Sequence, residues 1–381
     1  MPDMKRVLLI SNVPQTYRIP LFNEIDRQLN HKAIQLKVVF ASDGYKRRKS
    51  KIDFSEMKFQ YEILKSFKIN FGNVEKTMFT YGGISNLISE YKPDKIIVLG
   101  FSLATIKIFL RSLFKKTDYV IWSGALIMAT QKYSILRQML RRVLIRRASA
   151  FVAYGSKAKQ YLIDQGASPE KVHIGINTVD SRFFFVETDK IRATLTPDVK
   201  KHLLYIGYLV PRKNVMKLID IIEELSVTRK DFVLDIIGDG SDKPLLEKAV
   251  EEKKLGEFVN FHGFIQRNGL PKYFAQSACF LFQTDFDVWG LVLNEAMAAG
   301  LPVLSSVNAA ATYDLIVEGE TGFAVDYNDS DQIIEKIKLL LDNPELSKRI
   351  GDNAHRLIAA KASIAISAQG FVNSVTGSES H

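Results

Sequence analysis

Residues 278–306 read ACFLFQTDFDVWGLVLNEAMAAGLPVLSS, and this stretch decides the fold class. It opens with an apolar run short enough for a buried parallel strand, passes through a polar turn and continues as a periodic apolar helix. Gly300 and Pro302 end that helix before a second apolar run. The pattern predicts a strand–loop–helix–strand unit of a doubly wound α/β sheet.

The start of the predicted helix is a candidate phosphate site, because ligands of open α/β sheets bind where strands end and helices begin. The amides of Gly290, Leu291 and Val292 would be unpaired first-turn donors, aimed at the ligand with the positive end of the helix dipole. Gly290 would let a phosphate approach without a Cβ in the way. With a diphosphate at the helix start, Asp287 and Glu295, eight positions apart, would face the two ends of the ligand, which favours a nucleotide-sugar.

A second motif follows the predicted strand at residues 202–206 and reads GYLVPRKN from Gly207 to Asn214. A turn at the end of a strand would bring Arg212 and Lys213 to the same crevice. There, two cations can neutralise the charge that develops on a departing nucleoside diphosphate.

The two motifs together resemble the signature of the retaining glycosyltransferases of family 4, which have the GT-B fold. The D-x7-E pattern is followed by AMAAGLPV, and Gly207 to Lys213 match the G-x-x-x-x-R-K element of that family. The family usually has Glu where this chain has Asp287, one methylene shorter. The resemblance implies two doubly wound, Rossmann-like domains facing each other across a cleft. It also implies a nucleoside-diphosphate sugar as the donor substrate, with no cofactor and no metal.

The resemblance assigns a role to each matching residue. Arg212 and Lys213 would bind the donor diphosphate, and the amides at 290–292 would hold its distal phosphate. Asp287 would contact the donor sugar and Glu295 the ribose hydroxyls. The nucleobase would lie near Phe264 and Ile265, held mostly through backbone.

Strand and helix patterns extend over both halves of the chain and predict two domains. We expect an N-terminal acceptor domain at residues 1–188 and a C-terminal donor domain at 189–360, with a polar linker near 187–201. By the resemblance, a terminal helix at about 361–381 packs back on the first domain.

The composition indicates a globular protein kept in the cytosol. Of 381 residues, 46% are hydrophobic and 25% charged, and the one cysteine, Cys279, excludes an intrachain disulfide framework. We expect no signal peptide and no membrane span. The net charge of +10 is uneven, because residues 1–185 hold 31 Lys and Arg against 14 Asp and Glu. An anionic partner is therefore expected on the first half.

The acceptor would contact loops that follow strands of the first half. The family often has a histidine after the strand that ends at Trp122, but this chain reads WSGA there. Arg18 could contact a phosphate or lie on the surface, and Trp122 could line a sugar site or belong to the core. The candidates on the acceptor side are Asn12, Tyr17, Arg18, Phe101, Trp122 and Ser123.

Two further segments of the first half are basic. Residues 43–72 are expected to be irregular, either a solvated loop or a flap over the acceptor. Residues 132–149 predict a helix with Arg137, Arg141, Arg142, Arg146 and Arg147 largely off an apolar stripe. The stripe consists of Ile135, Leu136, Met139, Leu140, Val143 and Leu144. Such a helix can cover a sheet or bind an anionic membrane surface, and the basic first half favours the membrane.

These features together predict a retaining glycosyltransferase acting on a saccharide acceptor, which we expect to be lipid-linked and destined for a cell-surface polysaccharide or glycolipid. The enzyme would be cytoplasmic and peripheral on the inner face of the membrane. One alternative is a sugar-nucleotide epimerase of the same fold, and another is a non-catalytic module that binds polyanions or membranes. Nucleic acid is not expected as a partner. Asp285 and Asp287 also form a D-x-D sequence, but a metal clamp of that kind belongs to a different, single-domain fold.

Overall fold

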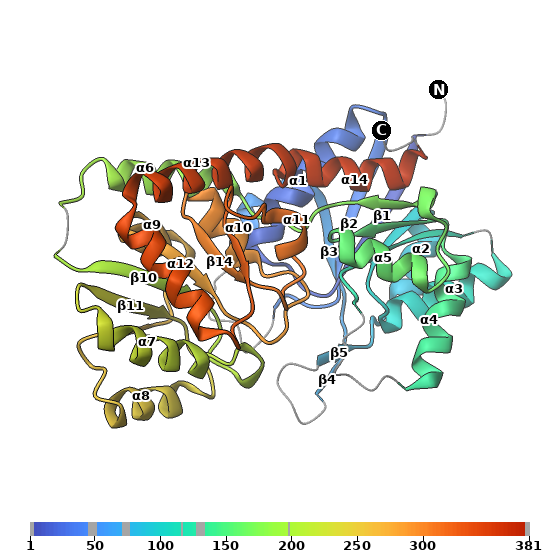
Figure 1. Cartoon of the computed structure of the whole chain (residues 1–381). Helices are drawn as coiled ribbons and strands as arrows, with labels where there is room; N and C mark the ends of the chain where they lie inside the picture. The colour runs from blue at the N-terminus through green and yellow to red at the C-terminus, as the bar shows by residue number, and fades with distance from the viewer. Residues whose placement is uncertain are drawn as a thin grey trace. The chain divides into compact units, whose positions relative to one another are not determined.

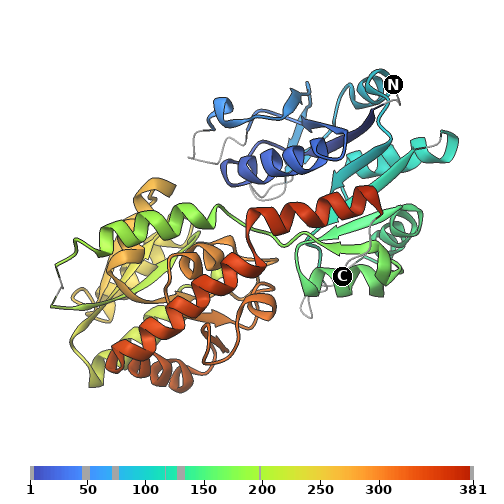
Figure 2. The ribbon, with the colours of Figure 1, turned by 90° about the horizontal axis from the view of Figure 1, so that it is seen from above.

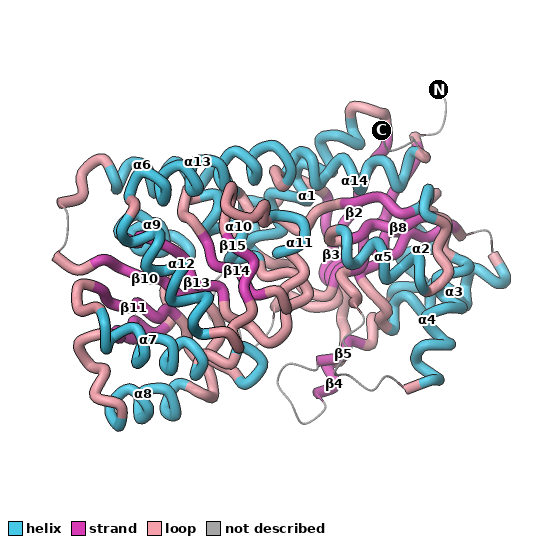
Figure 3. Tube along the Cα trace, viewed as in Figure 1, coloured by secondary structure: helices cyan, strands magenta, loops and turns pink. Residues whose placement is uncertain are grey.

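The computed structural model describes residues 4–44, 52–70, 77–115, 117–126, 134–196 and 199–377. The chain divides into two compact units. The first unit comprises Met1–Val179 and Ile364–His381, and the second comprises Asp180–Ser363. Each unit has its own parallel sheet with helices packed around it (Figures 1 and 3).

The first unit is built on a parallel sheet of seven strands in the order β3-β2-β1-β6-β7-β8-β9, and a small antiparallel pair, β4 and β5, is separate from it. The order reverses between β1 and β6, as in a doubly wound fold. Its strands are β1 (Lys5–Ser11), β2 (Ile34–Phe40), β3 (Gln60–Ile63), β4 (Lys68–Asn70), β5 (Thr77–Phe79), β6 (Lys95–Leu99), β7 (Asp118–Ser123), β8 (Ala150–Ala153) and β9 (Val172–Ile174). Its helices are α1 (Ile19–Asn30), α2 (Ile84–Tyr91), α3 (Leu103–Phe114), α4 (Ile135–Arg147), α5 (Ser156–Asp164) and α14 (Ile364–Thr376).

The C-terminal helix α14 packs on α1, β8 and β9 of the first unit (Figure 2). Phe371 of α14 is fully buried and meets the Trp122 ring edge-on at 5.0 Å. At Gly370 a side chain would come within 2.2 Å of the Ile174 carbonyl, so a glycine allows α14 to lie directly against β9. The last helix of the chain is therefore part of the core of the first unit.

The second unit is built on a parallel sheet of six strands in the order β12-β11-β10-β13-β14-β15, which reverses between β10 and β13. Its strands are β10 (Lys201–Ile206), β11 (Phe232–Ile237), β12 (Val259–Gly263), β13 (Ser277–Phe282), β14 (Val303–Ser306) and β15 (Phe323–Val325). Its helices are α6 (Ser181–Arg192), α7 (Met216–Thr228), α8 (Lys243–Glu252), α9 (Leu270–Gln276), α10 (Leu291–Ala298), α11 (Thr312–Leu315), α12 (Ser330–Asp342) and α13 (Pro344–Lys361).

Helices cover both faces of the six-stranded sheet. The apolar side chains of α7, α8 and α12 form one core with alternate residues of β10 and β11, while α6, α9, α10 and α13 pack against one another. The predicted strand–loop–helix–strand unit at 278–306 is confirmed as β13, α10 and β14. Because all six strands are parallel, the loops after them gather at one edge of the sheet.

The boundary between the units differs from the expected one. The division comes after Val179, nine residues before the boundary expected at 188, and α6 extends through residues 187–192 of the expected linker. The Asp180 side chain caps α6 by accepting a hydrogen bond from the Phe183 amide at 3.2 Å. Phe184 is fully buried against Phe274 of α9. Capping and burial together make α6 an element of the second unit.

Two basic segments of the first unit also differ from expectation. Residues 43–72 are not wholly irregular, because β3 extends the sheet beside β2; residues 45–51 and 71–72 lie outside the described part. In α4 only Leu144 and Ile145 are buried, and the rest of the expected stripe is exposed. Within the described residues, no helix is both long and apolar enough to cross a membrane.

Candidate functional site

The candidate site lies at the topological switch point of the six-stranded sheet. The order of strands reverses between β10 and β13, and ligands of doubly wound sheets bind in the crevice at such a point. The loop after β10 carries Arg212 and Lys213, and the loop after β13 carries Asp287 and leads into α10. The fold therefore brings the two sequence motifs together across about 75 residues of chain.

The centre of the site is an ion pair between the two loops. Nζ of Lys213 lies 2.5 Å from Oδ2 of Asp287, and a guanidinium nitrogen of Arg212 lies 3.9 Å from the same oxygen. The Lys213 side chain is 7% exposed and its ammonium lies 5.1 Å from the centre of the Phe282 ring, whereas the Arg212 side chain is 38% exposed. Lys213 is therefore an inner cation held by a carboxylate and a ring, and Arg212 is an outer cation accessible to a ligand.

The turn that leads into α10 requires a glycine. Gly290 has φ +98°, a left-handed conformation that other residues rarely adopt, and a side chain there would come within 2.3 Å of the Phe282 ring. The preceding residue, Trp289, is buried and donates through Nε1 to Asn294 at 2.9 Å. α10 begins at Leu291, and the side chains of Leu291 and Val292 are half-buried. The turn at Gly290 therefore determines where the first-turn amides of α10 lie.

Glu295 lies about one turn into α10, since the helix begins at Leu291. Loss of water around its half-buried carboxylate raises its pKa from 4.5 to about 7, and the nearby positive charge of Arg267 opposes part of that rise. Arg267 itself forms an ion pair with Asp180 at 3.3 Å and stacks over Phe183. No sequence motif marks Arg267, which lies in a short 3-10 turn (Arg267–Gly269).

A pH-dependent stability should follow from this raised pKa. Because the folded protein keeps the Glu295 proton to a higher pH than the unfolded chain does, its stability falls as pH rises from about 4.5 to 7. Glu295→Gln removes the titrating group. We therefore expect the Tm of this variant, relative to wild type, to rise between pH 5 and pH 8 in thermal unfolding. Glu320→Gln, at an exposed glutamate of the same unit, is the control; an equal Tm difference at both pH values for Glu295→Gln would contradict the prediction.

The remaining donor-side candidates follow β10 and β12, two strands of the same sheet that are separated by β11. Gly207 comes directly after β10, where a side chain would lie within 2.7 Å of the Tyr205 hydroxyl. Phe264 and Ile265 follow β12, and Phe264 is exposed whereas Ile265 is half-buried. Both lie at the same edge of the sheet as the other donor-side candidates, and their contact with the nucleobase stays a prediction.

Asp285 and Asp287, the two acids of the D-x-D sequence, have separate cation partners. Asp285 pairs with Lys217 at 3.1 Å, whereas Asp287 pairs with Lys213. Among the described residues, no group of three or more His, Cys, Asp and Glu side chains is arranged to hold a metal ion. Asp285, Lys217 and Asn214 were not among the residues expected at the site, although Asp285 lies two positions from one that was.

Two acceptor-side candidates of the first unit are structural. Trp122 is 1% exposed and packs against Phe22, Tyr154 and Phe371, so it belongs to the core and cannot line a sugar site. Ser123 is also buried, and its hydroxyl accepts a hydrogen bond from the Ala125 amide at 3.0 Å.

The other four candidates lie at the carboxyl ends of strands or in the turn before α1. Arg18 is buried rather than on the surface; it donates to the Tyr154 hydroxyl at 2.9 Å and its guanidinium lies 4.5 Å from the Trp122 ring. Asn12 accepts a hydrogen bond from the Tyr81 hydroxyl. Tyr17 and Phe101 are half-buried. Tyr81 has φ +50°, a backbone conformation that is uncommon for residues with a side chain, so the loop that contacts Asn12 is conformationally constrained.

Comparisons with known proteins bear on the family and the fold of this chain. Residues 186–357 match the model of the family described as glycosyl transferases group 1. An alpha-D-kanosaminyltransferase of Streptomyces kanamyceticus is 27% identical over 58% of this chain and 59% of its own length. An alpha-monoglucosyldiacylglycerol synthase of Acholeplasma laidlawii is 27% identical over 40% of this chain and 37% of its own length. The matches thus span less than two thirds of these two relatives.

A solved structure, Anabaena Alr3699/HepE in complex with UDP, superposes with a TM-score of 0.77 over 98% of this chain and 100% of that chain, at 17% identity. At 17% identity the similarity shows the fold alone, and it covers both doubly wound units. Residues 186–357 therefore belong to the glycosyl transferases group 1 family, and the chain has the GT-B fold.

Proposed function

We propose that this protein transfers a sugar from a nucleoside-diphosphate sugar to a saccharide acceptor, with retention of the anomeric configuration. The observation that carries the proposal is the cluster of Arg212, Lys213 and Asp287 beside the first turn of α10. Two cations and one carboxylate leave one positive charge in excess at the place where a diphosphate is expected. The UDP bound by Anabaena Alr3699/HepE supports a nucleotide of this class.

Each member of the cluster has a defined task in this reaction. Transfer breaks the bond between the anomeric carbon and a phosphate oxygen, so negative charge builds on the leaving diphosphate. Arg212 and Lys213 stabilise that charge from one side, and the amides at 290–292 stabilise it from the other. Asp287 accepts hydrogen bonds from the donor sugar, and Glu295 accepts them from the ribose. These cations supply the charge that a divalent metal supplies in other transferases.

A panel of UDP-, GDP- and ADP-sugars tests the proposal. We expect one donor class to be hydrolysed slowly without an acceptor, and the matching nucleoside diphosphate to raise the Tm by mass action. The hydrolysis should survive EDTA. Recovery of an epimerised sugar nucleotide would favour the epimerase alternative. Stabilisation by heparin alone, lost with added salt, would favour a polyanion-binding module.

The acceptor side of the proposal rests on an exposed apolar face of the first unit. We define the α3–α4 face as Leu110, Leu113 and Phe114 of α3 with Ile135, Leu136, Met139, Leu140 and Val143 of α4, all at least 40% exposed. Exposed arginines accompany it on α4. Apolar side chains surrounded by basic ones fit an anionic bilayer. The protein thus docks on the inner leaflet and acts on a lipid-linked saccharide, as the glycolipid named for the Acholeplasma relative also suggests.

Binding to liposomes should depend on the charge of α4. Each basic residue near an anionic surface contributes about 1 kcal/mol, so reversing three of them should weaken binding by at least roughly 100-fold. The arginines to replace by Glu are Arg137, Arg142 and Arg146, all exposed; Arg141 is excluded because it donates to the Tyr161 hydroxyl. Co-sedimentation with anionic and with neutral vesicles measures the change.

A matched control reverses three exposed lysines of the second unit. These are Lys248, Lys272 and Lys361, each replaced by Glu. The control changes the net charge equally and should bind anionic vesicles far better than the α4 variant. If both triple variants lose binding equally, net charge rather than α4 attracts the vesicles. If wild type binds neutral vesicles as well as anionic ones, the docking proposal is wrong.

A further inference from the structure

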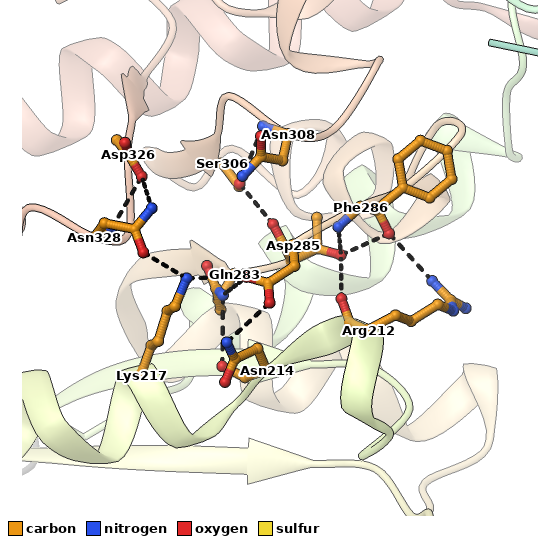
Figure 4. A network of polar contacts seen from close by, with 11 residues as sticks. Arg212, Asn214, Lys217, Gln283, Asp285, Phe286, Ser306, Asn308, Asp326 and Asn328 are labelled. Atoms are coloured by element: carbon orange, nitrogen blue, oxygen red, sulfur yellow. Dashed lines mark hydrogen bonds and ion pairs between the residues drawn. The ribbon is translucent and has the colours of Figure 1, made fainter. Parts of the chain in front are cut away.

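Asp285 joins two loops of the candidate site (Figure 4). Its Oδ2 accepts a hydrogen bond from the Asn214 amide group at 2.8 Å, and its Oδ1 lies 3.1 Å from Nζ of Lys217. Gln283 donates to the same Oδ1 at 3.2 Å and approaches the Asn214 carbonyl at 3.4 Å. The Asp285 carboxylate, in the loop after β13, thus contacts two residues that come shortly after the Arg212–Lys213 pair: Asn214 in the turn and Lys217 in α7.

The backbones of the two loops are joined at the same place. The Arg212 carbonyl accepts hydrogen bonds from the Asp285 amide at 3.0 Å and from the Thr284 hydroxyl at 3.3 Å. The backbone of Arg212 therefore cannot move without breaking contacts to the loop that carries Asp287. The Arg212 side chain, by contrast, is the outer cation of the site; its guanidinium lies 3.5 Å from the Phe286 carbonyl and 3.9 Å from Asp287.

Asn214 has a backbone conformation that needs support. Its φ of +41° and ψ of +52° are left-handed, and asparagine tolerates this region better than most residues but less well than glycine. The hydrogen bond from its side-chain amide to Asp285 stabilises this backbone conformation. This turn ends the short 3-10 helix Pro211–Lys213, so it sets the direction in which Arg212 and Lys213 leave the backbone.

Lys217 lies in an electrostatically unfavourable position that Asp285 compensates. It is the second residue of α7, where the positive end of the helix dipole disfavours a cation. Besides Asp285, its ammonium contacts Oδ1 of Asn328 at 2.8 Å, in the loop after β15. Asn328 is in turn fixed by Asp326 at 2.8 Å. The contacts extend across loops that follow three strands of the sheet.

We propose that Asp285 is a positioning residue that holds the Arg212–Lys213 pair in place for the diphosphate, acting through Asn214. This inference rests on the proposed function of the same site. Asp285 itself is too fully engaged with Asn214, Lys217 and Gln283 to serve as a second sugar-binding acid. Its effect reaches the ligand through the conformation of the turn.

The test compares nucleoside diphosphates with monophosphates by calorimetry, using UDP and UMP, GDP and GMP, and ADP and AMP. Asp285→Asn keeps the size of the side chain but leaves one acceptor oxygen in place of two, so it cannot accept from Asn214 and from Lys217 and Gln283 at once. Asn214→Gly keeps the left-handed turn but removes the amide that Asp285 holds. We expect each variant to weaken diphosphate binding about 5- to 10-fold and monophosphate binding less than 2-fold. The double variant should be no weaker than Asp285→Asn alone, because both changes remove one connection.

A conservative control removes a carboxylate charge elsewhere in the unit. Asp342 forms an exposed ion pair with Arg229 at 2.6 Å, and Asp342→Asn should leave both affinities unchanged. Equal losses for diphosphate and monophosphate in Asp285→Asn would show a general structural role and overturn the inference. Additive losses in the double variant would overturn the route through Asn214. If wild type binds none of the six nucleotides, the proposed function itself fails, and the inference fails with it.

Discussion

Replacing Lys213 by alanine should lower kcat/KM for the nucleotide-sugar donor by roughly 10- to 100-fold. A charge-assisted hydrogen bond contributes about 1.5–3 kcal/mol, and the contact proposed for Lys213 strengthens as the diphosphate departs. Both kcat and kcat/KM should therefore fall. Steady-state donor hydrolysis, or transfer once an acceptor is known, measures the effect.

Lys213 should have a larger effect than Arg212 for a structural reason. Its side chain is nearly buried and forms a 2.5 Å ion pair, so its loss leaves the Asp287 carboxylate with a single cation at 3.9 Å. A partly buried carboxylate that loses its partner is destabilised, and it would also repel the diphosphate. Arg212→Ala removes an outer, more exposed cation and should have the smaller effect.

Two companion variants separate charge from packing. Lys213→Met keeps an unbranched apolar side chain beside the Phe282 ring and removes the charge, so its kinetics should match those of Lys213→Ala. Lys243→Ala, at a lysine that pairs with Glu247 on the surface of α8, should leave the kinetics unchanged. Wild-type kinetics in both Lys213 variants would remove Lys213 from the donor site.

The parts of the site that could be predicted are those that sequence periodicity and turn chemistry determine locally. The alternation of apolar run, polar turn and apolar helix predicted β13, α10 and β14, because each of these elements carries its own pattern. Gly290 belongs to the same local pattern, whereas the Arg212–Lys213 pair was assigned from the resemblance to the family, and the phosphate contacts of all three residues stay a prediction. Their closeness was expected from topology, since parallel strands place their carboxyl ends at one edge.

The parts that were missed depend on which residues meet over long distances. Asp285 contacts Asn214 across 71 positions, and no local pattern distinguishes it from a turn-forming acid. Trp122 looked equally suitable for a sugar site and for a core, and its packing against Phe22, Tyr154 and Phe371, which come from distant parts of the chain, decides for the core. The stripe on α4 has the correct helical period, but periodicity does not tell whether an apolar face has a partner.

Gly290→Ala should reduce both the stability of the second unit and its affinity for nucleoside diphosphates. The new Cβ would lie 2.3 Å from Cζ of Phe282, and the φ of +98° disfavours any residue with a side chain. Overpacking costs about 1–3 kcal/mol and a left-handed conformation about 1–2 kcal/mol more. For a unit of this size each kcal/mol lowers the Tm by roughly 2–4 °C, so a loss of roughly 4–20 °C is expected in thermal unfolding.

The loss of affinity should exceed what the loss of stability explains, because any relief of the clash moves either Phe282 or the start of α10. Phe282 supports the Lys213 ammonium, and the start of α10 carries the amides proposed to bind phosphate. Gly256→Ala is the matched control, since a side chain there would meet no atom within 4 Å. Combining Gly290→Ala with Phe282→Leu distinguishes the two causes. If the Tm recovers but diphosphate binding does not, the clash with Phe282 causes the loss of stability. The phosphate site would then need both the Phe282 ring and the native turn at the start of α10. A Gly290→Ala variant that matches Gly256→Ala in both Tm and affinity would show that neither depends on the glycine.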